Sequence, residues 1–157
     1  MEIEIIKGNN VRIDPTVKFI GTGKIILGDR VQIRTNAVIE IDGILEIGER
    51  SVIGYHNTLQ VSGHMVIGKG SLIGPSCILL ASAHQITDVP LVDEKLLKST
   101  LTIKDNVWVG GNCTINHGII LESDCIIGAN SFVKSNVPRG AIYAGSPAKL
   151  IRYRHPQ

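Results

Sequence analysis

Residues 101–133 read LTIKDNVWVGGNCTINHGIILESDCIIGANSFV, and an aliphatic residue returns at every sixth position. The aliphatic positions are Ile103, Val109, Ile115, Leu121, Ile127 and Val133. Three residues later in each unit stands a type that tolerates a left-handed backbone or makes local turn hydrogen bonds. These are Asn106, Asn112, Gly118, Asp124 and Asn130. Each hexapeptide therefore predicts one short strand and one tight corner.

The same unit runs through the N-terminal half with a longer period. Glycine recurs at intervals of 20 residues, as Gly8, Gly28, Gly48 and Gly68. Three hexapeptides make a triangular coil of about 18 residues, or 20 where one corner carries two extra residues, and the aliphatic residues of successive coils stack. We therefore expect a single all-β domain over 1–157, a parallel β-helix of about six coils.

One interruption breaks the repeat. Ile67 and Ile103 lie 36 residues apart, where one coil needs about 18. The surplus falls at about 82–100 and predicts a long protruding loop, a feature that compact folds keep mainly for function. His84 lies at the base of this loop. After the last regular unit we expect a short C-terminal extension at about 138–157.

Composition and charge narrow the classes of function. Hydrophobic residues make up 43% of the chain and aromatic residues only 4%, so Ile, Val and Leu must fill the core. No apolar run is long enough for a signal peptide or a membrane span, which favours a cytoplasmic protein. Residues 1–124 carry all 14 acidic residues, whereas 125–157 carry five basic residues and no acid. Without interleaved aromatic residues this basic segment favours a small phosphorylated ligand over nucleic acid.

The hexapeptides, together with LTIKDNVWVGGNCTI, IIGANSFV and AGSPAKLIR in that order, resemble the left-handed β-helix acyltransferases. Most similar are the galactoside and maltose O-acetyltransferases and the polysaccharide O-acetyltransferases. The resemblance covers nearly the whole chain. It implies left-handed coils, a homotrimer with active sites between subunits, acetyl-CoA as co-substrate and a carbohydrate acceptor.

The resemblance also implies roles for individual residues. His84 is the general base that takes the proton of an acceptor hydroxyl as it attacks the thioester. The amide of Gly111 is the candidate for stabilising the oxyanion. The CoA-binding candidates are Trp108, Gly110, Gly111, Ala129, Lys134, Ser135, Lys149 and Arg152. Relatives usually read Thr-Lys where this chain has Lys134-Ser135, so the lysine is displaced by one position.

The acceptor site is less specified. Its candidates are Tyr55, His56, Asp88 and His117. The histidines fall in different phases of the repeat, so we expect no metal site. Transfer of an acetyl group to the nitrogen of an amino sugar would use the same machinery, and a non-catalytic hexapeptide scaffold is the alternative from outside the enzymes. The combination of His84 with the basic C-terminal segment favours an enzyme over a scaffold, and the resemblance favours a sugar hydroxyl as the acceptor.

Overall fold

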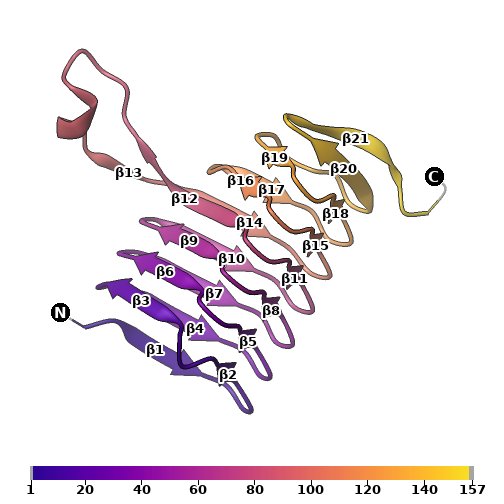
Figure 1. Cartoon of the computed structure of the whole chain (residues 1–157), viewed down its shortest axis with the longest axis horizontal. Helices are drawn as coiled ribbons and strands as arrows, with labels where there is room; N and C mark the ends of the chain where they lie inside the picture. Colours follow the sequence, from indigo (N-terminus) through magenta and orange to yellow (C-terminus); the bar gives the residue numbers. More distant parts are fainter. Residues whose placement is uncertain (1, 156–157) are drawn as a thin grey trace.

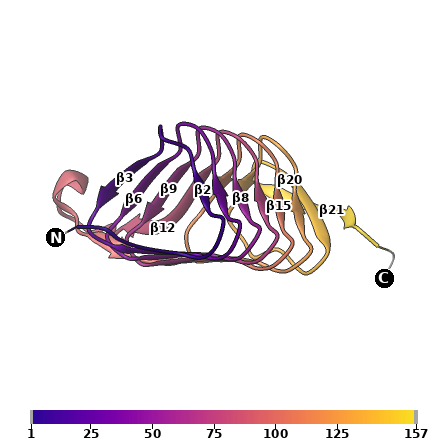
Figure 2. The ribbon, with the colours of Figure 1, turned by 90° about the horizontal axis from the view of Figure 1, so that it is seen from below.

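The computed structural model describes residues 2–155, which wind into a stack of coils running from the N-terminus to the C-terminus (Figure 1). Seen from below, the coils lie one behind another along a single axis (Figure 2). Three parallel sheets, here called A, B and C, form the sides of the stack. The predicted parallel β-helix is confirmed.

The sheets contain one strand from each coil. Sheet A comprises β1 (Glu4–Lys7), β4 (Lys24–Leu27), β7 (Ile44–Ile47), β10 (His64–Ile67), β14 (Thr100–Ile103) and β17 (Ile119–Leu121). Sheet B comprises β2 (Arg12–Ile13), β5 (Gln32–Ile33), β8 (Val52–Ile53), β11 (Leu72–Ile73), β15 (Trp108–Val109), β18 (Ile126–Ile127), β20 (Ala141–Gly145) and β21 (Ala148–Tyr153). Sheet C comprises β3 (Lys18–Gly21), β6 (Val38–Ile41), β9 (Thr58–Val61), β12 (Ile78–His84), β16 (Thr114–Ile115) and β19 (Phe132–Val133).

The number of coils differs slightly from the expected six. Six coils have a strand in each sheet. A seventh is partial, with Val137 bridging to Leu121 beside sheet A and β20 pairing with β18 in sheet B. β21 then turns back antiparallel to β20 and ends sheet B.

The core consists of aliphatic residues that stack in register. Ile25 pairs with Leu45, Leu45 with Met65, and Met65 with Leu101, and all four side chains are fully buried. Such alternation of inward and outward residues is what parallel strands with one buried face require. The hexapeptide spacing thus sets which side chains point outward on each sheet.

Most corners are tight turns with one residue in the left-handed backbone conformation. Between sheets B and C, the same corner position has φ between 55° and 60° in five successive coils, at Asn36, His56, Ser76, Asn112 and Asn130. Asparagine tolerates this conformation better than most residues with a Cβ. His56 therefore serves the corner, as its place in the repeat suggests.

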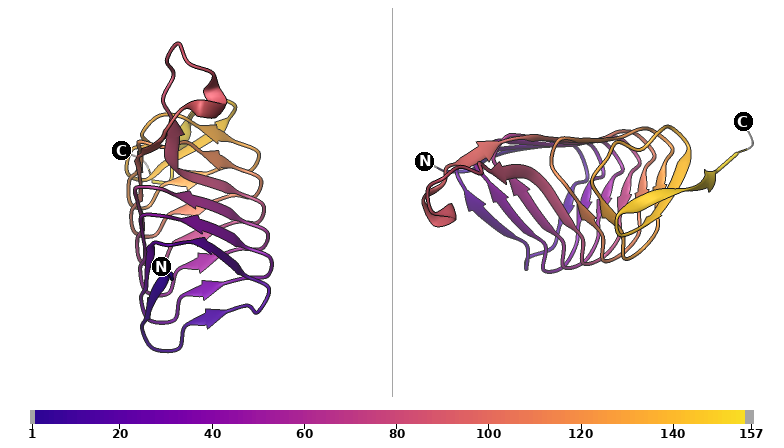
Figure 3. Two further views of the ribbon diagram at one scale, coloured as in Figure 1. Left: turned by 90° about the vertical axis from the view of Figure 1, so that its left-hand side faces the viewer. Right: turned by 90° about the horizontal axis from the view of Figure 1, so that it is seen from above.

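The loop leaves the stack as a hairpin. β12 continues past the coil to His84, and β13 (Leu96–Lys98) returns antiparallel to it, pairing Ser82 with Lys98 and His84 with Leu96. A short 3₁₀ turn, η1 (Leu91–Asp93), lies near the tip. The hairpin projects from the side of the stack in two perpendicular views (Figures 1 and 3).

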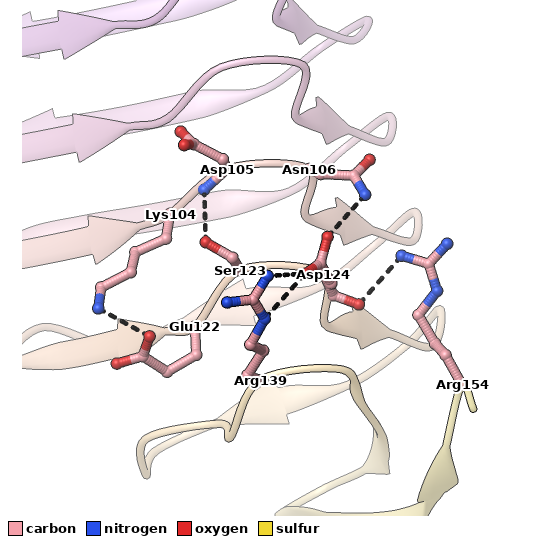
Figure 4. Close-up of polar contacts among 8 residues, drawn as sticks. All are labelled: Lys104, Asp105, Asn106, Glu122, Ser123, Asp124, Arg139 and Arg154. Carbon is pink, nitrogen blue, oxygen red and sulfur yellow. Dashed lines mark hydrogen bonds and ion pairs between the residues drawn. The ribbon is translucent and has the colours of Figure 1, made fainter. Parts of the chain in front are cut away.

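The C-terminal segment is held against the last coils by hydrogen bonds and an ion pair from two arginines to Asp124. Arg139 donates to a carboxylate oxygen of Asp124 through Nε at 3.1 Å and Nη2 at 2.9 Å, and Arg154 donates to the main-chain oxygen of Asp124 at 3.1 Å. The two arginines reach Asp124 from opposite sides, and Asn106 donates to its other carboxylate oxygen (Figure 4). These contacts hold the pKa of Asp124 below its usual range, the bond from Asn106 contributing most. Within residues 2–155 there is no helix long and apolar enough to cross a membrane.

Candidate functional site

A furrow whose floor carries no side chains runs along the corner between sheets B and C. The residue that follows the inward position of each sheet B strand is glycine in four successive coils, and its amide donates to the next coil. These residues are Gly54, Gly74, Gly110 and Gly128. The row of outward residues on sheet B forms one wall, and these are Val52, Leu72, Trp108 and Ile126. The residues after the glycines form the other wall, and these are Tyr55, Pro75, Gly111 and Ala129. We call this feature the sheet B furrow.

The furrow encloses a cavity of about 570 Å³ with a mainly apolar lining. Trp108 is 51% exposed and Leu72 is 44% exposed, so a continuous apolar strip faces outward at this place. Single exposed apolar residues are ordinary, but a contiguous apolar patch in a concave site indicates a ligand or a partner.

The two glycines of VGGN have different surroundings. A Cβ on Gly110 would lie 2.6 Å from the amide nitrogen of Ala129, so this glycine is required by the close approach of the next coil. Its own amide donates to Ile127 O at 2.8 Å and is therefore not available to a ligand. A Cβ on Gly111 would meet only Pro75, at 3.3 Å.

Free main-chain donors lie along the same wall of the furrow. Within residues 2–155, the amides of Gly111 and Ala129 donate to no acceptor, whereas those of their neighbours Gly110, Asn112 and Asn130 all do. An extended ligand that carries its own amides could accept hydrogen bonds there without displacing protein contacts. The furrow therefore fits an apolar arm with amide groups, such as the pantetheine of CoA.

The basic residues of β21 extend the furrow at its C-terminal end. Arg152 pairs directly with Ile142, and Ile142 continues the outward row above Ile126. Directly opposed residues of antiparallel strands have their side chains on the same face, so Arg152 lies on the outer face of sheet B. Lys149 pairs with Ala144, which follows Gly128 in the furrow row. This end of the furrow thus has cations suited to phosphate groups.

Two of the expected CoA residues lie elsewhere. Lys134 and Ser135 follow β19 on the side of sheet C, and the amide of Asn116 donates to Val133 just before them. In a single chain they are therefore on a different side from Lys149 and Arg152.

His84 lines a second cavity, of about 410 Å³, on the outer face of sheet C near its corner with sheet A. His84 is the last residue of β12, and its pairing with Leu96 fixes the backbone at this point. Ser62, which is buried, donates to Leu97 O at 3.0 Å and to Ala81 O at 3.3 Å, and so attaches the base of the hairpin to the stack. The side chain of His84 is exposed and hydrogen-bonds to no other residue of the described chain, which leaves its ring nitrogens available to a ligand.

His117 lines the same cavity. Its Nδ1 lies 3.1 Å from Ser99 Oγ, at the point where the returning hairpin rejoins the stack. Three polar residues beside it were not predicted from the sequence, and these are Glu40, Gln60 and Asn116. Gln60 Nε2 donates to Glu40 Oε2 at 3.1 Å. They stand in one outward row of sheet C with Leu80, with Gln60 and Asn116 one coil from Leu80 and Glu40 two coils from it, and this phase in the repeat was the signal that could have found them.

The remaining acceptor candidates are dispersed. Tyr55 lines the sheet B furrow, not the cavity of His84. His56 is at the adjacent corner, and Asp88 is exposed in the hairpin. His84 and Gly111 themselves line different cavities at different corners of the stack of coils. A single chain therefore does not bring the proposed base and the proposed oxyanion donor together.

The three cysteines lie inside the coils. Cys77 and Cys113 donate to the main-chain oxygens of Gly110 and Gly128, at 3.1 and 3.2 Å, beneath the furrow. Hydrogen bonding to Cys113, with burial, raises the pKa of Cys77, and burial raises the pKa of Cys125 to about 12. The thiols of Cys77 and Cys125 are therefore poor nucleophiles. Hydrogen bonding with Cys77 lowers the pKa of Cys113 to about 7, but this thiol is buried inside the coil. In the part of the chain that the structure describes, no group of three or more His, Cys, Asp or Glu residues could hold a metal ion.

Comparison with known proteins identifies the repeat. Residues 101–135 match the family model described as bacterial transferase hexapeptide (six repeats). The putative lipopolysaccharide biosynthesis O-acetyl transferase WbbJ of Escherichia coli K12 is 36% identical over 69 residues, which are 43% of this chain and 35% of that protein. The galactoside O-acetyltransferase of the same strain is 38% identical over 52 residues, 33% of this chain and 26% of that protein. The matched region thus spans about a quarter to a third of the length of these curated relatives.

Solved structures agree over nearly the whole chain. A mutant of AntD, an N-acyltransferase from Bacillus cereus in complex with dTDP-4-amino-4,6-dideoxyglucose and coenzyme A, has a TM-score of 0.86 at 21% identity. The alignment covers 97% of this chain and 84% of AntD. The polySia-specific acetyltransferase NeuO has a TM-score of 0.68 at 25% identity, covering 97% of this chain and 86% of NeuO. The likeness to AntD shows a shared fold.

Proposed function

The chain carries the repeat of the hexapeptide transferase family, and from this premise we propose that it is an acetyl-CoA-dependent O-acetyltransferase acting on a sugar hydroxyl. The observation that carries the proposal is the sheet B furrow with its free amides and its basic end. Relatives named as O-acetyltransferases support the choice of reaction. AntD and its complex with coenzyme A support the choice of donor.

We propose that the donor lies along the furrow. Its phosphates meet Arg152 and Lys149, its pantetheine arm packs against Trp108, and a carbonyl oxygen of the arm accepts from the amide of Ala129, which leaves the amide of Gly111 for the thioester oxygen. Fixed cations suit phosphate groups, and an apolar furrow with few polar anchors suits the arm. No metal takes part in this scheme.

The active site is composite in this proposal. His84 and the furrow of one chain lie at different corners, so the base must act on a donor held by a neighbouring copy. In a homotrimer, sheet C of each subunit would face the furrow of the next subunit. This arrangement would form three complete active sites, one at each interface. In such an arrangement Lys134, which lies on the side of sheet C, would also approach the donor of the neighbour.

Catalysis then follows from the proposed placement. Neutral His84 takes the proton of the acceptor hydroxyl while its oxygen attacks the thioester carbonyl. The Gly111 amide donates to the oxygen of the tetrahedral intermediate. Collapse of the intermediate forms the acetyl ester and releases CoA, whose sulfur takes up the proton that His84 removed from the hydroxyl. His117 and the polar residues beside it, Glu40, Gln60 and Asn116, line the place where the acceptor would bind.

Transfer to nitrogen is the second candidate, because AntD is an N-acyltransferase that binds an amino sugar linked to dTDP. An amine is a better nucleophile than a hydroxyl and depends less on a base. The cavity of His84, with its unpaired imidazole, favours oxygen.

The experiment measures thiol release from acetyl-CoA with sugars, amino sugars and their nucleotide-linked forms. His84→Ala should lower kcat by about 10²-fold or more with a hydroxyl acceptor. The matched control is His155→Ala, which removes an imidazole from the C-terminal segment. A His84→Ala variant as active as the wild type would refute the assigned base. Absence of turnover and of CoA binding in the wild type would refute the enzyme and favour a scaffold.

A further inference from the structure

The sheet B furrow ends at a charged residue on its N-terminal side. The row of glycines continues from Gly54 to Arg34, whose amide donates to Ile53 O at 3.0 Å in the same way as those of the glycines above it. Arg34 is thus the first side chain that stands in the furrow, two coils before Gly74. Its guanidinium lies at the end opposite to Arg152.

Arg34 is held in one orientation by Tyr55. Its Nη1 donates to the Tyr55 hydroxyl at 3.1 Å, and its guanidinium carbon lies 5.3 Å from the centre of the tyrosine ring. Stacking on an aromatic ring leaves the edge of the guanidinium open, so most of its five N–H donors stay free. Among residues 2–155, no carboxylate lies within ion-pair distance of Arg34.

A further cavity of about 490 Å³ opens on the far side of this pair. It shares Arg34 and Tyr55 with the furrow, so these two side chains border both spaces. Arg12 adds a second positive charge to its lining.

Asp14 is the acidic residue of this cavity, and its carboxylate is already engaged. One oxygen accepts from Thr16 Oγ1 at 2.6 Å and from the Thr16 amide at 2.9 Å, and the other accepts from Thr35 Oγ1 at 3.2 Å. The bonds from Thr16, followed by that from Thr35, hold its pKa below the usual range. With Asp14 ionised, the two arginines leave the cavity with a net positive charge.

We propose that Arg34, positioned by Tyr55, binds an oxyanion carried by the acceptor, so that the acceptor is an acidic sugar or a sugar bearing a phosphate. The inference rests on the proposed function. Successive coils lie about 4.8 Å apart, which puts Arg34 about 10 Å below the level of Gly74 and of the coil that bears His84. Along the axis of the stack, the carboxylate or phosphate therefore lies about 10 Å from the level of the hydroxyl that is acetylated. The second sugar of an acidic disaccharide or the diphosphate of a nucleotide sugar reaches this far.

The test compares three ligands that differ in charge: a neutral galactose disaccharide, the corresponding galacturonic acid disaccharide, and UDP-galactose. Binding is measured by calorimetry without acyl donor, and kcat and KM are measured with acetyl-CoA. The variants are Arg34→Gln and Tyr55→Phe, with Arg50→Gln as the control. Arg50 is an exposed arginine at another corner of the stack, so its substitution removes the same charge elsewhere.

The expected result is that the wild type binds a charged ligand more tightly than the neutral one. Arg34→Gln should weaken binding of that ligand about 10- to 100-fold, as the loss of a charge-assisted contact does, with the change in KM and not in kcat. Tyr55→Phe should have a smaller effect in the same direction, and Arg50→Gln none. Which charged ligand responds distinguishes a carboxylate from a phosphate.

The inference is overturned if neither charged ligand binds better than the neutral one, or if Arg34→Gln affects charged and neutral ligands equally. Titration with CoA keeps the two proposals separate. Wild type and Arg34→Gln should bind CoA with the same affinity, since Arg34 lies beyond the proposed acyl end of the furrow. A wild type that binds the charged ligands but not CoA would refute the proposed function and leave the anion site standing.

Discussion

The two adjacent glycines of VGGN, Gly110 and Gly111, should respond differently to substitution by alanine, the first in stability and the second in affinity for CoA. Gly110→Ala would place a methyl group 2.6 Å from the amide nitrogen and 3.0 Å from the Cα of Ala129. These are backbone atoms of the next coil, and they cannot move without breaking the bond from Gly110 N to Ile127 O at 2.8 Å. Overpacking of this kind costs about 1–3 kcal/mol. For a chain of this size the loss corresponds to a decrease in Tm of about 2–12 °C.

Gly111→Ala should leave the fold intact. The atoms nearest to the new methyl group would be ring carbons and the main-chain oxygen of Pro75, at 3.3 Å, and Pro75 is exposed and can shift by a few tenths of an ångström. The reduced freedom of the unfolded chain offsets this contact, so the free energy of unfolding should stay within about 0.5 kcal/mol of wild type. The methyl group would stand beside the free amide in the furrow. We therefore expect the affinity for CoA to fall about tenfold, which is about 1.4 kcal/mol.

Thermal denaturation and calorimetric titration with CoA, on both variants and the wild type, check these values. Gly54→Ala is a second structural control, because its Cβ would lie 2.6 Å from Ile73 O. The reasoning is refuted if Gly110→Ala is as stable as the wild type. It is equally refuted if Gly111→Ala is stable and binds CoA with unchanged affinity.

Three further outcomes follow from the structure. Trp108 is the chain's one tryptophan and lines the furrow half-exposed, so titration with CoA should change its fluorescence; an unchanged spectrum at saturation would place the donor elsewhere. Arg152→Gln should weaken CoA binding about three- to tenfold at low salt and little at high salt, because an exposed phosphate contact is screened; an effect that does not depend on salt would contradict the role in phosphate binding. Asp124→Asn should lower the free energy of unfolding by about 0.5–1 kcal/mol at pH 7, since it removes the pairing with Arg139. Because the pKa of Asp124 is lowered in the folded state, this difference should disappear as the pH falls below 3.8 in denaturation curves, and a constant difference would contradict the assignment.

Much of the fold follows from the local repeat. The hexapeptide phase predicted which residues are buried, because a coil of fixed length can stack only in the register that puts Ile103, Val109 and Ile115 inside. The same phase made Trp108 an outward residue and His56 a corner residue. The partial seventh coil was missed because β20 and β21 do not keep the six-residue spacing, and their pairing depends on contacts with the preceding coils.

The site was less predictable than the fold. The position of His84 followed from the interruption, but its neighbours did not. Glu40, Gln60 and Asn116 come from three other coils, and their phase in the repeat predicts that they point outward from sheet C but not that the hairpin brings His84 beside them. The sequence likewise did not predict a role for Arg34, because its contact with Tyr55, 21 residues away, depends on the stacking of the coils.

The sequence by itself determined the parallel β-helix and the place where the chain leaves it, because a strict short period dictates strand, corner and stacking locally. Only the tertiary structure decided which outward residues share a surface. Residues 18 or 20 positions apart become neighbours at about 4.8 Å, and so do Met65 and Leu101, 36 positions apart, while Gly111 and His84, 27 positions apart, go to different corners. The physical reason is that stacking fixes heights along the axis through hydrogen bonds between coils, whereas the corner a residue occupies depends on where the preceding loop returns to the stack.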